Sequence, residues 1–569
     1  MRRLLLATLA VTLVAPAPAR AADPIMPLAE VQPGLRCTGL TVVRGVDIVA
    51  FDADIVDVVD RQRGSAARII VHVSGPAVDA TGLGPGFSGS PIICPGADGV
   101  GRNIGAISET VGEYGGHTAL ATPIESVLAQ PVLPPAATRS AAPARSSIIG
   151  ARSLAGPLTI AGLRPSLARS VVRAARKAGR VLIASPAGTR AAFAPQPLVP
   201  GASVSVGLTS GDIAIGVLGT VAYADGANVW VYGHEFDGAG RRSLFLQDAY
   251  IHTVVNNPIA VPDVSTYKLG SPGNDLGTIT SDGSAAVVGM FGAPPPNIAL
   301  RITARDLDTA RVVSSVTHVA DEADVGLPTG ASSLGMTAPA AIAEVAAEVL
   351  DGAPARQTGE LCVKAALREL RTPLHVCFRY AIDGPVQNGL AGAAANDVAS
   401  AVALLDSYRF GTLHATAIEV GLRVRRGLRQ AFIVGASGPR VARRGRTLRL
   451  RLRLRHTGSG RTTTRIVRLR VPSTAPTGLR TVRLIGTPAD AGVEPGDVGG
   501  DVVIAFEGED GGNDDPGGPR SLRELRAMFE GLARYDGVTA RLAGDERRIL
   551  RDPRLRVSGE ARVSLQILR

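Results

Sequence analysis

The sequence is poor in aromatic residues, and this shortage narrows what the chain can be. Of its 569 residues only 4% are Phe, Trp or Tyr, although 45% are hydrophobic. The chain also contains 67 glycines and 39 prolines. Small and branched apolar residues interrupted by Gly and Pro favour short strands joined by turns over long helices. The length indicates about three or four domains.

Beyond the N-terminal segment there is no uninterrupted run of roughly eighteen apolar residues, the length that a membrane-spanning helix needs. The N-terminus itself has the features of a secretory signal: Arg2 and Arg3, an apolar stretch at 4–14, and an A-x-A cleavage pattern at 19–21. An uncleaved membrane anchor is the alternative interpretation. These features predict a secreted, extracellular protein that is cleaved near Ala21 and has no integral membrane segment afterwards.

Cysteine is also scarce. Four cysteines in an exported chain favour disulfide bonds, and four allow three pairings. Cys37 and Cys94 lie in one predicted domain and Cys362 and Cys377 in another, so local pairs are expected. No Cys/His spacing resembles a zinc site, and the sequence predicts neither a metal nor another cofactor.

Positive charge, by contrast, is abundant in one place. The net charge is +11, and much of it lies in residues 443–471, where Leu448, Leu450, Leu452 and Leu454 alternate with arginines. Period two places leucines on one face of a strand and arginines on the other. A solvated sandwich face is the simpler interpretation. The alternative is contact with an anionic partner such as a cell-wall polymer or lipid headgroups. Nucleic acid is not expected, because no aromatic residues interleave with the arginines.

One glycine-rich segment has the composition of a nucleophile turn. In GPGFSGSPII, residues 84–93, Ser88 has a glycine two residues before it and another directly after it. Glycine lets the backbone turn sharply enough to expose a serine Oγ together with backbone N–H groups. A serine hydroxyl needs a neighbouring base to act as a nucleophile, so this pattern requires a histidine elsewhere. An ordinary glycine-serine turn of a β protein is the alternative.

Among the eight histidines, His234 is the best candidate for that base. In residues 216–240 an Asp-Gly turn at 225–226 joins two expected strands, and the second delivers Gly233 and His234 to the start of a loop. Catalytic groups concentrate in such loops. His117 and His252 are the alternative bases.

Three segments resemble the SpoIVB-type serine peptidases, family S55. GFSGSPII followed by GRNIGAISE is similar to the serine motif of that family, and GVLGTVAYADGANVWVYGHEF to its histidine segment. LGTITSDGSAAVVGMFG resembles the strand pair that follows. The resemblance implies a chymotrypsin-like double β-barrel in which Ser88 is the nucleophile and His234 the general base. The backbone N–H groups of Gly86 and Ser88 are the expected oxyanion donors.

The sequence departs from the family pattern in two ways. The histidine segment precedes the serine motif in the family's prototype, whereas here it follows much later, which is a permuted order. Such an order is physically acceptable because a catalytic triad is defined by geometry. Secondly, Ser74 occupies the position of the family's acid, so the triad acid stays unassigned. The alternatives are Asp79, Asp237, Asp248 and Asp275.

The expected fold is mainly β: a chymotrypsin-like double β-barrel peptidase core, then β-sandwich (Ig-like) modules and a small α/β tail. Helices are expected at 165–179 and 338–352. The tail is weakly PDZ-like, because 488–498 followed by 521–532 resembles the second half of a PDZ domain. The expected boundaries are 1–21 for the signal peptide, 22–132 for the serine-bearing half of the peptidase, 133–199 for a linker and helical segment, 200–355 for the histidine-bearing half, 356–440 for a β-sandwich-like module, 441–486 for basic sandwich strands and 487–569 for an acidic loop and tail.

The leading functional hypothesis is an exported serine endopeptidase that acts on a protein or peptide substrate by acyl transfer. The alternative is a non-catalytic exported binding or surface protein that retains the peptidase fold. A hydrogen bond between Ser88 Oγ and a His234 nitrogen, with a carboxylate behind the ring, would favour the enzyme.

Overall fold

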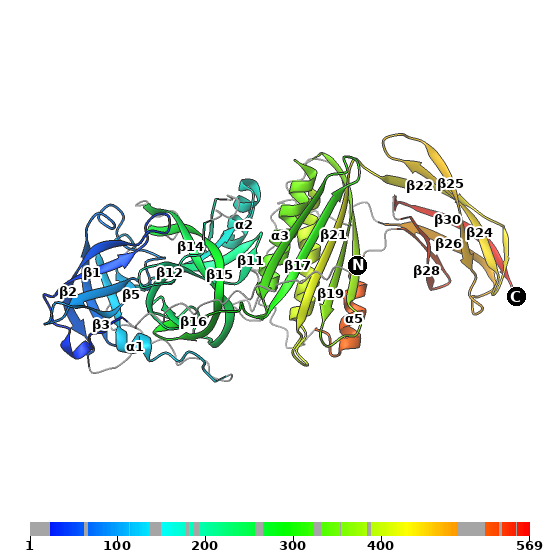
Figure 1. Cartoon of the computed structure of the whole chain (residues 1–569). Helices are drawn as coiled ribbons and strands as arrows, with labels where there is room; N and C mark the ends of the chain where they lie inside the picture. Colours follow the sequence, from blue (N-terminus) through cyan, green and yellow to red (C-terminus); the bar gives the residue numbers. More distant parts are fainter. Residues whose placement is uncertain are drawn as a thin grey trace, which may run out of the picture.

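The computed structural model is mainly β, with 52% of residues in strands and 15% in helices, as the composition predicts. Figure 1 shows the strand-rich parts following one another along the molecule, from the blue N-terminal barrel to the orange and red C-terminal sheets. The structure describes residues 23–61, 66–112, 114–135, 150–177, 181–186, 193–256, 266–322, 332–352, 354–383, 389–487, 518–533, 537–552 and 555–569. The expected signal peptide, 1–21, lies outside these ranges.

Six strands of the first sheet close into a barrel, here called the first barrel. Their order around it is β1-β2-β3-β6-β5-β4, and β4 pairs with β1 to close the ring. Phe51, Ala53 and Ile55 alternate along β2 and point into the interior, as a strand with one buried face requires. The strands are β1 (Arg36–Thr41), β2 (Val49–Val59), β3 (Arg68–Ser74), β4 (Pro91–Pro95), β5 (Gly101–Val111) and β6 (Thr118–Pro123). The 3-10 helix η1 (Leu28–Glu30), helix α1 (Ile124–Leu128) and strand β7 (Ala151–Ser153) flank it.

The second sheet contains another closed set of six strands, here called the second ring. It runs β10-β12-β13-β16-β15-β14, and β14 pairs with β10. Numbered along the chain, the strands of both rings follow the same order, 1-2-3-6-5-4. The strands are β10 (Ser203–Gly207), β12 (Ala214–Asp225), β13 (Asn228–Val231), β14 (Gly240–Asn256), β15 (Thr266–Gly283) and β16 (Ala286–Phe291). The loop between the third and fourth strands carries Ser88 in the first barrel and His234 in the second ring.

Residues 150–186 connect these two units through short elements. Strands β8 (Leu158–Ala161) and β9 (Leu182–Ala184) extend the second sheet beside β12. The helix expected at 165–179 is confirmed as α2 (Pro165–Lys177). It buries Leu167, Val171 and Ala175 on one face.

A third, open sheet is covered by two helices. Its strand order is β11-β18-β17-β21-β19-β20, and β21 pairs with β17 in parallel. The β-sandwich expected for 356–440 is therefore not what the structure has, because strands from both sides of the expected 355/356 boundary share one sheet. The strands are β11 (Thr209–Gly211), β17 (Asn297–Asp306), β18 (Val312–Ala320), β19 (Arg356–Leu367), β20 (Leu374–Asp383) and β21 (Ala415–Arg426).

The covering helices belong to the same apolar core as this sheet. The helix expected at 338–352 is α3 (Ser333–Leu350), which begins earlier because the Ser332 side chain accepts the N–H of Gly335 as an N-cap. Helix α4 (Gly389–Asp406) was missed by the sequence reasoning, since its alanine-rich run has little amphipathic pattern. Within the described ranges only α3 is long and apolar enough to cross a membrane, and 83% of it is buried inside the protein.

The C-terminal strands form two sheets around one core. One sheet has the order β25-β24-β22-β29 and the other β23-β30-β26-β27-β28. The tail expected as a separate α/β unit thus completes this sandwich with its strands. The strands are β22 (Gln430–Ser437), β23 (Val441–Arg443), β24 (Thr447–His456), β25 (Thr462–Arg470), β26 (Gly478–Gly486), β27 (Gly537–Leu542), β28 (Asp545–Arg551), β29 (Arg556–Ser558) and β30 (Glu560–Leu568).

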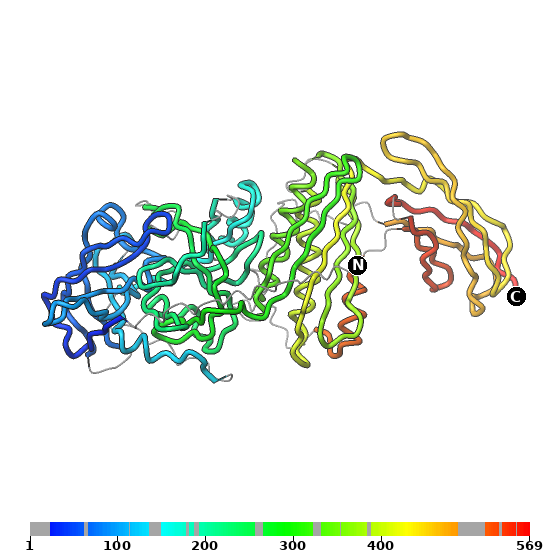
Figure 2. The backbone as a smooth tube through the Cα atoms, in the orientation of Figure 1, coloured from blue at the N-terminus to red at the C-terminus, as the bar shows by residue number. Residues whose placement is uncertain are grey.

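Helix α5 (Leu522–Gly531) leaves the sandwich and packs on β20 and α4. Its buried Leu525 and Phe529 join the core of the helix-covered sheet, and Figure 2 shows its backbone beside that sheet. This position differs from the expected PDZ-like tail, because the apolar face of the helix is used by another unit. Residues 488–498, which suggested the PDZ resemblance, lie outside the described ranges.

Both expected disulfides are confirmed. Cys37 on β1 is bonded to Cys94 on β4, and Cys362 on β19 to Cys377 on β20. Two disulfides suggest an oxidising, extracellular-type environment. The first bond joins two neighbouring strands of the first barrel across 57 residues of chain, and the second crosses a hairpin with a separation of 15.

Replacing Cys37 and Cys94 together by alanine should lower the free energy of unfolding by about 2 to 4 kcal/mol, because the unfolded chain regains the entropy that the cross-link removes. The pair Cys362→Ala and Cys377→Ala is the control and should cost less, since it closes a shorter loop. Denaturant unfolding of both variants measures the difference. Equal stability of the Cys37/Cys94 variant and the wild type would contradict the prediction.

Candidate active site

Ser88 lies on a tight turn whose conformation depends on glycine. Gly86 and Gly89 on either side have φ values of +97° and +91°, in the left-handed region that favours glycine. The Ser88 side chain is buried, with the residue 1% exposed, and its Oγ has no hydrogen-bond partner among the described residues. Within those residues no hydrogen bond is donated by the N–H of Gly86 or Ser88 either. The expected nucleophile and the expected oxyanion donors therefore share one turn with unused hydrogen-bonding capacity.

His234 lies near the start of the corresponding loop of the second ring. The backbone just before it, at Tyr232, is strained. Tyr232 has φ +74° and Gly233 has φ +77°. A tyrosine in the left-handed region is uncommon and costs on the order of 1 to 3 kcal/mol, a strain that clusters at functional sites. Tyr232 is held there by packing and by its buried hydroxyl, which donates to the carbonyl of Val217 at 2.7 Å.

The environment of His234 defines the form of its ring. Nδ1 lies 2.6 Å from the carbonyl oxygen of Glu235, so Nδ1 carries the proton and the lone pair is on Nε2. Nε2 is buried and has no hydrogen-bond partner in the described part of the chain. The ring stacks on Tyr232 with centroids 5.5 Å apart. Burial lowers the pKa of His234 to about 4, which makes the ring a neutral base at ordinary pH.

The serine turn and the second ring are locked together by backbone contacts. Thr220 on β12 donates its N–H to the carbonyl of Ser88 at 2.8 Å. A Cβ on Gly89 would lie 1.9 Å from the Thr220 carbonyl oxygen and 2.7 Å from the Tyr232 nitrogen, so no larger residue fits there without movement. The end of β13, from which the chain continues to His234, thus lies beside Gly89, the residue that follows Ser88.

A second set of contacts joins the histidine loop to the first barrel. Thr122 on β6 donates its hydroxyl hydrogen to the carbonyl of Gly233 at 2.7 Å. A Cβ on Gly233 would come within 3.3 Å of the Ile107 carbonyl oxygen, and that same oxygen accepts the N–H of Gly89 at 2.7 Å. The structure therefore brings the two predicted residues into one interface, although no hydrogen bond joins Ser88 Oγ to His234 Nε2.

None of the aspartates considered as the triad acid contacts the His234 ring in the described residues. Each has other partners: Asp79 accepts from the Gly75 N–H at 2.7 Å, Asp237 lies 3.2 Å from Arg242, Asp248 accepts from the Gln196 N–H at 2.8 Å, and Asp275 accepts from the Ser210 hydroxyl at 2.6 Å. Behind Nδ1 there is instead a backbone carbonyl.

A different carboxylate, that of Asp282, holds the histidine loop. It is fully buried and accepts the N–H groups of Phe236 and Asp237 at 2.7 and 2.9 Å. Burial and the neighbouring Asp282 raise the pKa of Asp237 to about 8. The sequence analysis did not single out Asp282, which lies near the end of β15, just before the turn that joins this strand to β16.

The two alternative bases have other neighbours. His252 Nε2 is 3.1 Å from the hydroxyl of Ser271, which is in turn 2.5 Å from that of Ser185. His117 lies near His72, with ring centroids 6.4 Å apart. Within the described ranges no hydrogen bond joins either ring to the serine turn. The loop of His234 shares a neighbour with that turn, because the Ile107 carbonyl oxygen that accepts the Gly89 N–H also lies against Gly233.

Lys268 on β15 is a buried cation that the sequence did not indicate. Its Nζ donates to the hydroxyls of Thr41 and Thr220 at 2.6 and 3.2 Å and lies 4.6 Å from the centroid of the Phe87 ring. The Thr220 hydroxyl donates in turn to the carbonyl of Gly86 at 3.0 Å. Burial lowers the pKa of Lys268 to about 7. A short chain of hydrogen bonds therefore connects this lysine to the backbone of the serine turn.

Other ionisable groups near His234 are also buried. Arg68 and Glu109 form an ion pair at 2.8 Å with little exposure of either side chain. Burial raises the pKa of Glu235. Several groups with perturbed pKa values at one interface are typical of a functional site, although buried ion pairs that only support structure produce shifts of the same kind.

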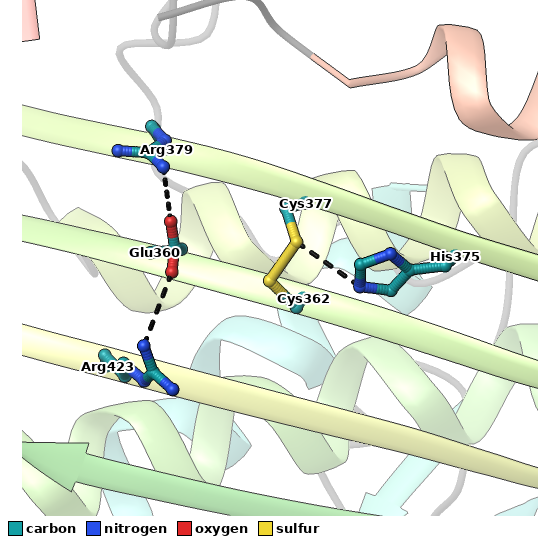
Figure 3. The surroundings of a disulfide bond; sticks show 6 residues. All are labelled: Glu360, Cys362, His375, Cys377, Arg379 and Arg423. Carbon is teal, nitrogen blue, oxygen red and sulfur yellow. Dashed lines mark hydrogen bonds and ion pairs between the residues drawn. A yellow bond between two sulfur atoms is a disulfide. The ribbon is translucent and has the colours of Figure 1, made fainter. Parts of the chain in front are cut away.

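The second disulfide has a histidine close to it. The sulfurs of Cys362 and Cys377 and a nitrogen of His375 all lie within 4.8 Å of one another, and Figure 3 shows the ring beside the bond. Because the two sulfurs are bonded to each other, they are not thiolates that could hold a metal ion. On β19 itself, Glu360 forms ion pairs with Arg379 on β20 at 2.6 Å and with Arg423 on β21 at 3.9 Å, and these pairs join the three strands.

Comparison with known proteins gives no relative: no protein-family model, no curated protein and no solved structure matches this chain.

The low pKa of Lys268 makes stability depend on pH. Below about pH 7 the lysine is protonated in both the folded and the unfolded chain. Between about 7 and its ordinary value of 10.5 only the unfolded chain binds the proton, so the wild type gains stability as the pH rises, by up to about 5 kcal/mol. Lys268→Met lacks this gain, and thermal unfolding from pH 6 to 10 should show the wild type improving relative to the variant. Lys364→Met, at an exposed lysine, is the control. If the stability of wild type and of Lys268→Met changes with pH in the same way, the prediction is contradicted.

Proposed function

We propose that this chain is an exported serine endopeptidase in which Ser88 is the nucleophile and His234 the general base. The observation that carries the proposal is the meeting of two corresponding loops. Each supplies one buried polar atom, Ser88 Oγ or His234 Nε2, that lacks a hydrogen-bond partner among the described residues. A buried polar atom without a partner is costly, and such atoms are retained at sites that act on a ligand.

In this proposal Ser88 Oγ attacks the carbonyl carbon of a peptide bond while its proton passes to His234 Nε2. The negative charge that develops on the carbonyl oxygen is stabilised by the N–H groups of Gly86 and Ser88. The imidazolium then gives its proton to the leaving amine, and the acyl group remains on Ser88 as an ester. Water, deprotonated by the same nitrogen, attacks the ester and restores the hydroxyl.

The missing carboxylate modifies this mechanism. The Glu235 carbonyl fixes the tautomer of His234, as a triad acid does, but a neutral acceptor stabilises the imidazolium less than a charged one. The proposed enzyme is a Ser–His dyad, and its turnover should be slower than that of a complete triad.

The strand order of the two rings supports the proposal that the core is a chymotrypsin-like double β-barrel, since one six-stranded arrangement occurs twice in succession. In such an arrangement the catalytic groups lie between the barrels, where Ser88 and His234 are placed. Membership of the SpoIVB-type peptidases rests on the three sequence segments, and the permuted order of serine and histidine is part of that proposal.

A second proposal, a non-catalytic binding protein with the same fold, is favoured by one observation. Ser88 is 1% exposed, so a substrate reaches its Oγ only if the two loops separate. A protein that lost its chemistry would keep this closed interface, whereas a peptidase must open it.

Labelling with a fluorophosphonate probe tests the assignment directly. The wild-type protein should be labelled, whereas Ser88→Ala should lose labelling entirely and His234→Ala should lose it by at least about a hundredfold in rate, because the hydroxyl then has no base. Ser90→Ala is the matched control, since Ser90 is also buried with an unpartnered Oγ in the same turn. An unlabelled wild type that is folded by circular dichroism would favour the binding protein, and labelling that survives Ser88→Ala would refute the nucleophile.

The pKa of the proposed base also determines the pH below which the rate of labelling falls. His234 must be neutral to accept the proton, and burial lowers its pKa to about 4. The rate of labelling should therefore be retained down to about pH 5 and fall as the pH drops through about 4. A limb centred near 6.5, the ordinary pKa of histidine, would mean that the ring is solvated when it reacts.

A further inference from the structure

The arginines that alternate along β24 occupy one exposed face of the C-terminal sandwich. Leu448, Leu450, Leu452 and Leu454 are buried in its core, as the alternation predicts. Arg449, Arg451, Arg453 and Arg455 are all exposed on the opposite face. Residues two apart in a strand are separated by about 6.8 Å, so these four guanidinium groups form a row of about 20 Å along the sheet.

Neighbouring strands add positive charge to this row and no negative charge. Arg468 on β25 lies directly opposite Arg449, and exposed Arg470 is close by on the same face. Strand β22, on the other side, contains no charged residue. The sequence between Glu419 and Asp490 has no acidic residue at all, and no ion pair within the described residues involves any of the six arginines.

Fold stability does not account for such a row. Like charges directly opposite each other across two strands, as at Arg449 and Arg468, are destabilising. Charged side chains can protect an edge strand from pairing with other chains, which is a sufficient reason for those on β25. Strand β24 lies between β22 and β25, so its four arginines protect no edge.

The cation is always arginine. All eighteen basic residues between Glu419 and Asp490 are arginines, and none is a lysine. The guanidinium group binds carboxylate, sulfate or phosphate oxygens through two parallel hydrogen bonds, whereas lysine is a flexible point charge. Arginine at regular spacing is therefore suited to a partner that carries planar or multi-oxygen anions at regular spacing.

We propose that the outer face of β22, β24 and β25 binds an extended anionic polysaccharide along the arginine row. A single row of charge fits a linear polymer, whereas a lipid bilayer presents its charge in two dimensions. The exposed hydroxyls of Thr462 and Thr464 and the exposed apolar side chains of Phe432 and Ile466 lie beside the row, where they can contact sugar hydroxyls and the apolar faces of sugar rings. A nucleic acid would need several aromatic residues for base stacking, and this face offers one. The surface is independent of the proposed peptidase activity.

Binding of the full-length secreted protein to heparin, a sulfated polysaccharide, tests the proposal. The variant Arg449→Gln, Arg451→Gln, Arg453→Gln, Arg455→Gln should bind at least about tenfold more weakly at moderate salt. The slope of log affinity against log salt should fall by about one for each arginine removed. Replacing the same four residues by lysine keeps the charge and should restore the salt slope more fully than the affinity.

The control removes the same charge elsewhere. Arg169→Gln, Arg301→Gln, Arg305→Gln, Arg409→Gln alters four exposed arginines outside the sandwich and should leave heparin affinity within about twofold of the wild type. Thermal unfolding should show that both quadruple variants are folded. If both then lose heparin affinity equally, the effect comes from net charge alone and the proposal is overturned. Stronger binding to phosphatidylglycerol vesicles or to single-stranded DNA than to heparin, lost in the β24 variant, would replace the polysaccharide by that partner.

Discussion

The candidate site depends on a close backbone contact between the first barrel and the second ring. The Gly89 backbone lies against the Thr220 carbonyl and the Tyr232 nitrogen, so the contact leaves no space for a side chain. Strand β12 is bonded there to the Ser88 carbonyl, and the serine turn and the histidine loop are thereby held against each other. Without this contact Ser88 and His234 would lie on loops of two separate units that do not meet.

The same contact excludes water, and the exclusion accounts for the electrostatics of the site. A charged form in a dry environment loses its hydration, so the pKa values of His234 and Lys268 fall and those of Asp237 and Glu235 rise. For a general base the consequence is favourable, because the histidine stays neutral. For access of a substrate it is unfavourable, because the nucleophile is closed off. Catalysis in such a site requires a motion that separates the loops without losing the dry surroundings.

Charge is distributed in the opposite way in the C-terminal sandwich. In the site, ionisable groups are buried and have specific partners, as Arg68 has in Glu109. On the outer face of β24 the arginines are exposed and form no ion pair with an acidic group in the described part of the chain. Burial and pairing are the means of tuning the chemistry of a group, whereas exposure without pairing leaves the charge available to a partner. The two ends of the chain are therefore suited to different tasks.

The sequence alone determined those features that are local in the chain. Period-two alternation placed the leucines and arginines of β24, the glycines around Ser88 indicated a tight turn, the spacing of α2 and α3 indicated helices, and the separation of the cysteines indicated their pairing. Tertiary structure decided what depends on distant segments: the pairing of β21 with β17, the completion of the sandwich by the tail, the docking of α5, and the approach of Asp282 and Lys268 to the two loops. These contacts join residues far apart in the chain, and one sequence carries no local signal for them, because a strand edge or a buried lysine looks the same whichever partner it meets.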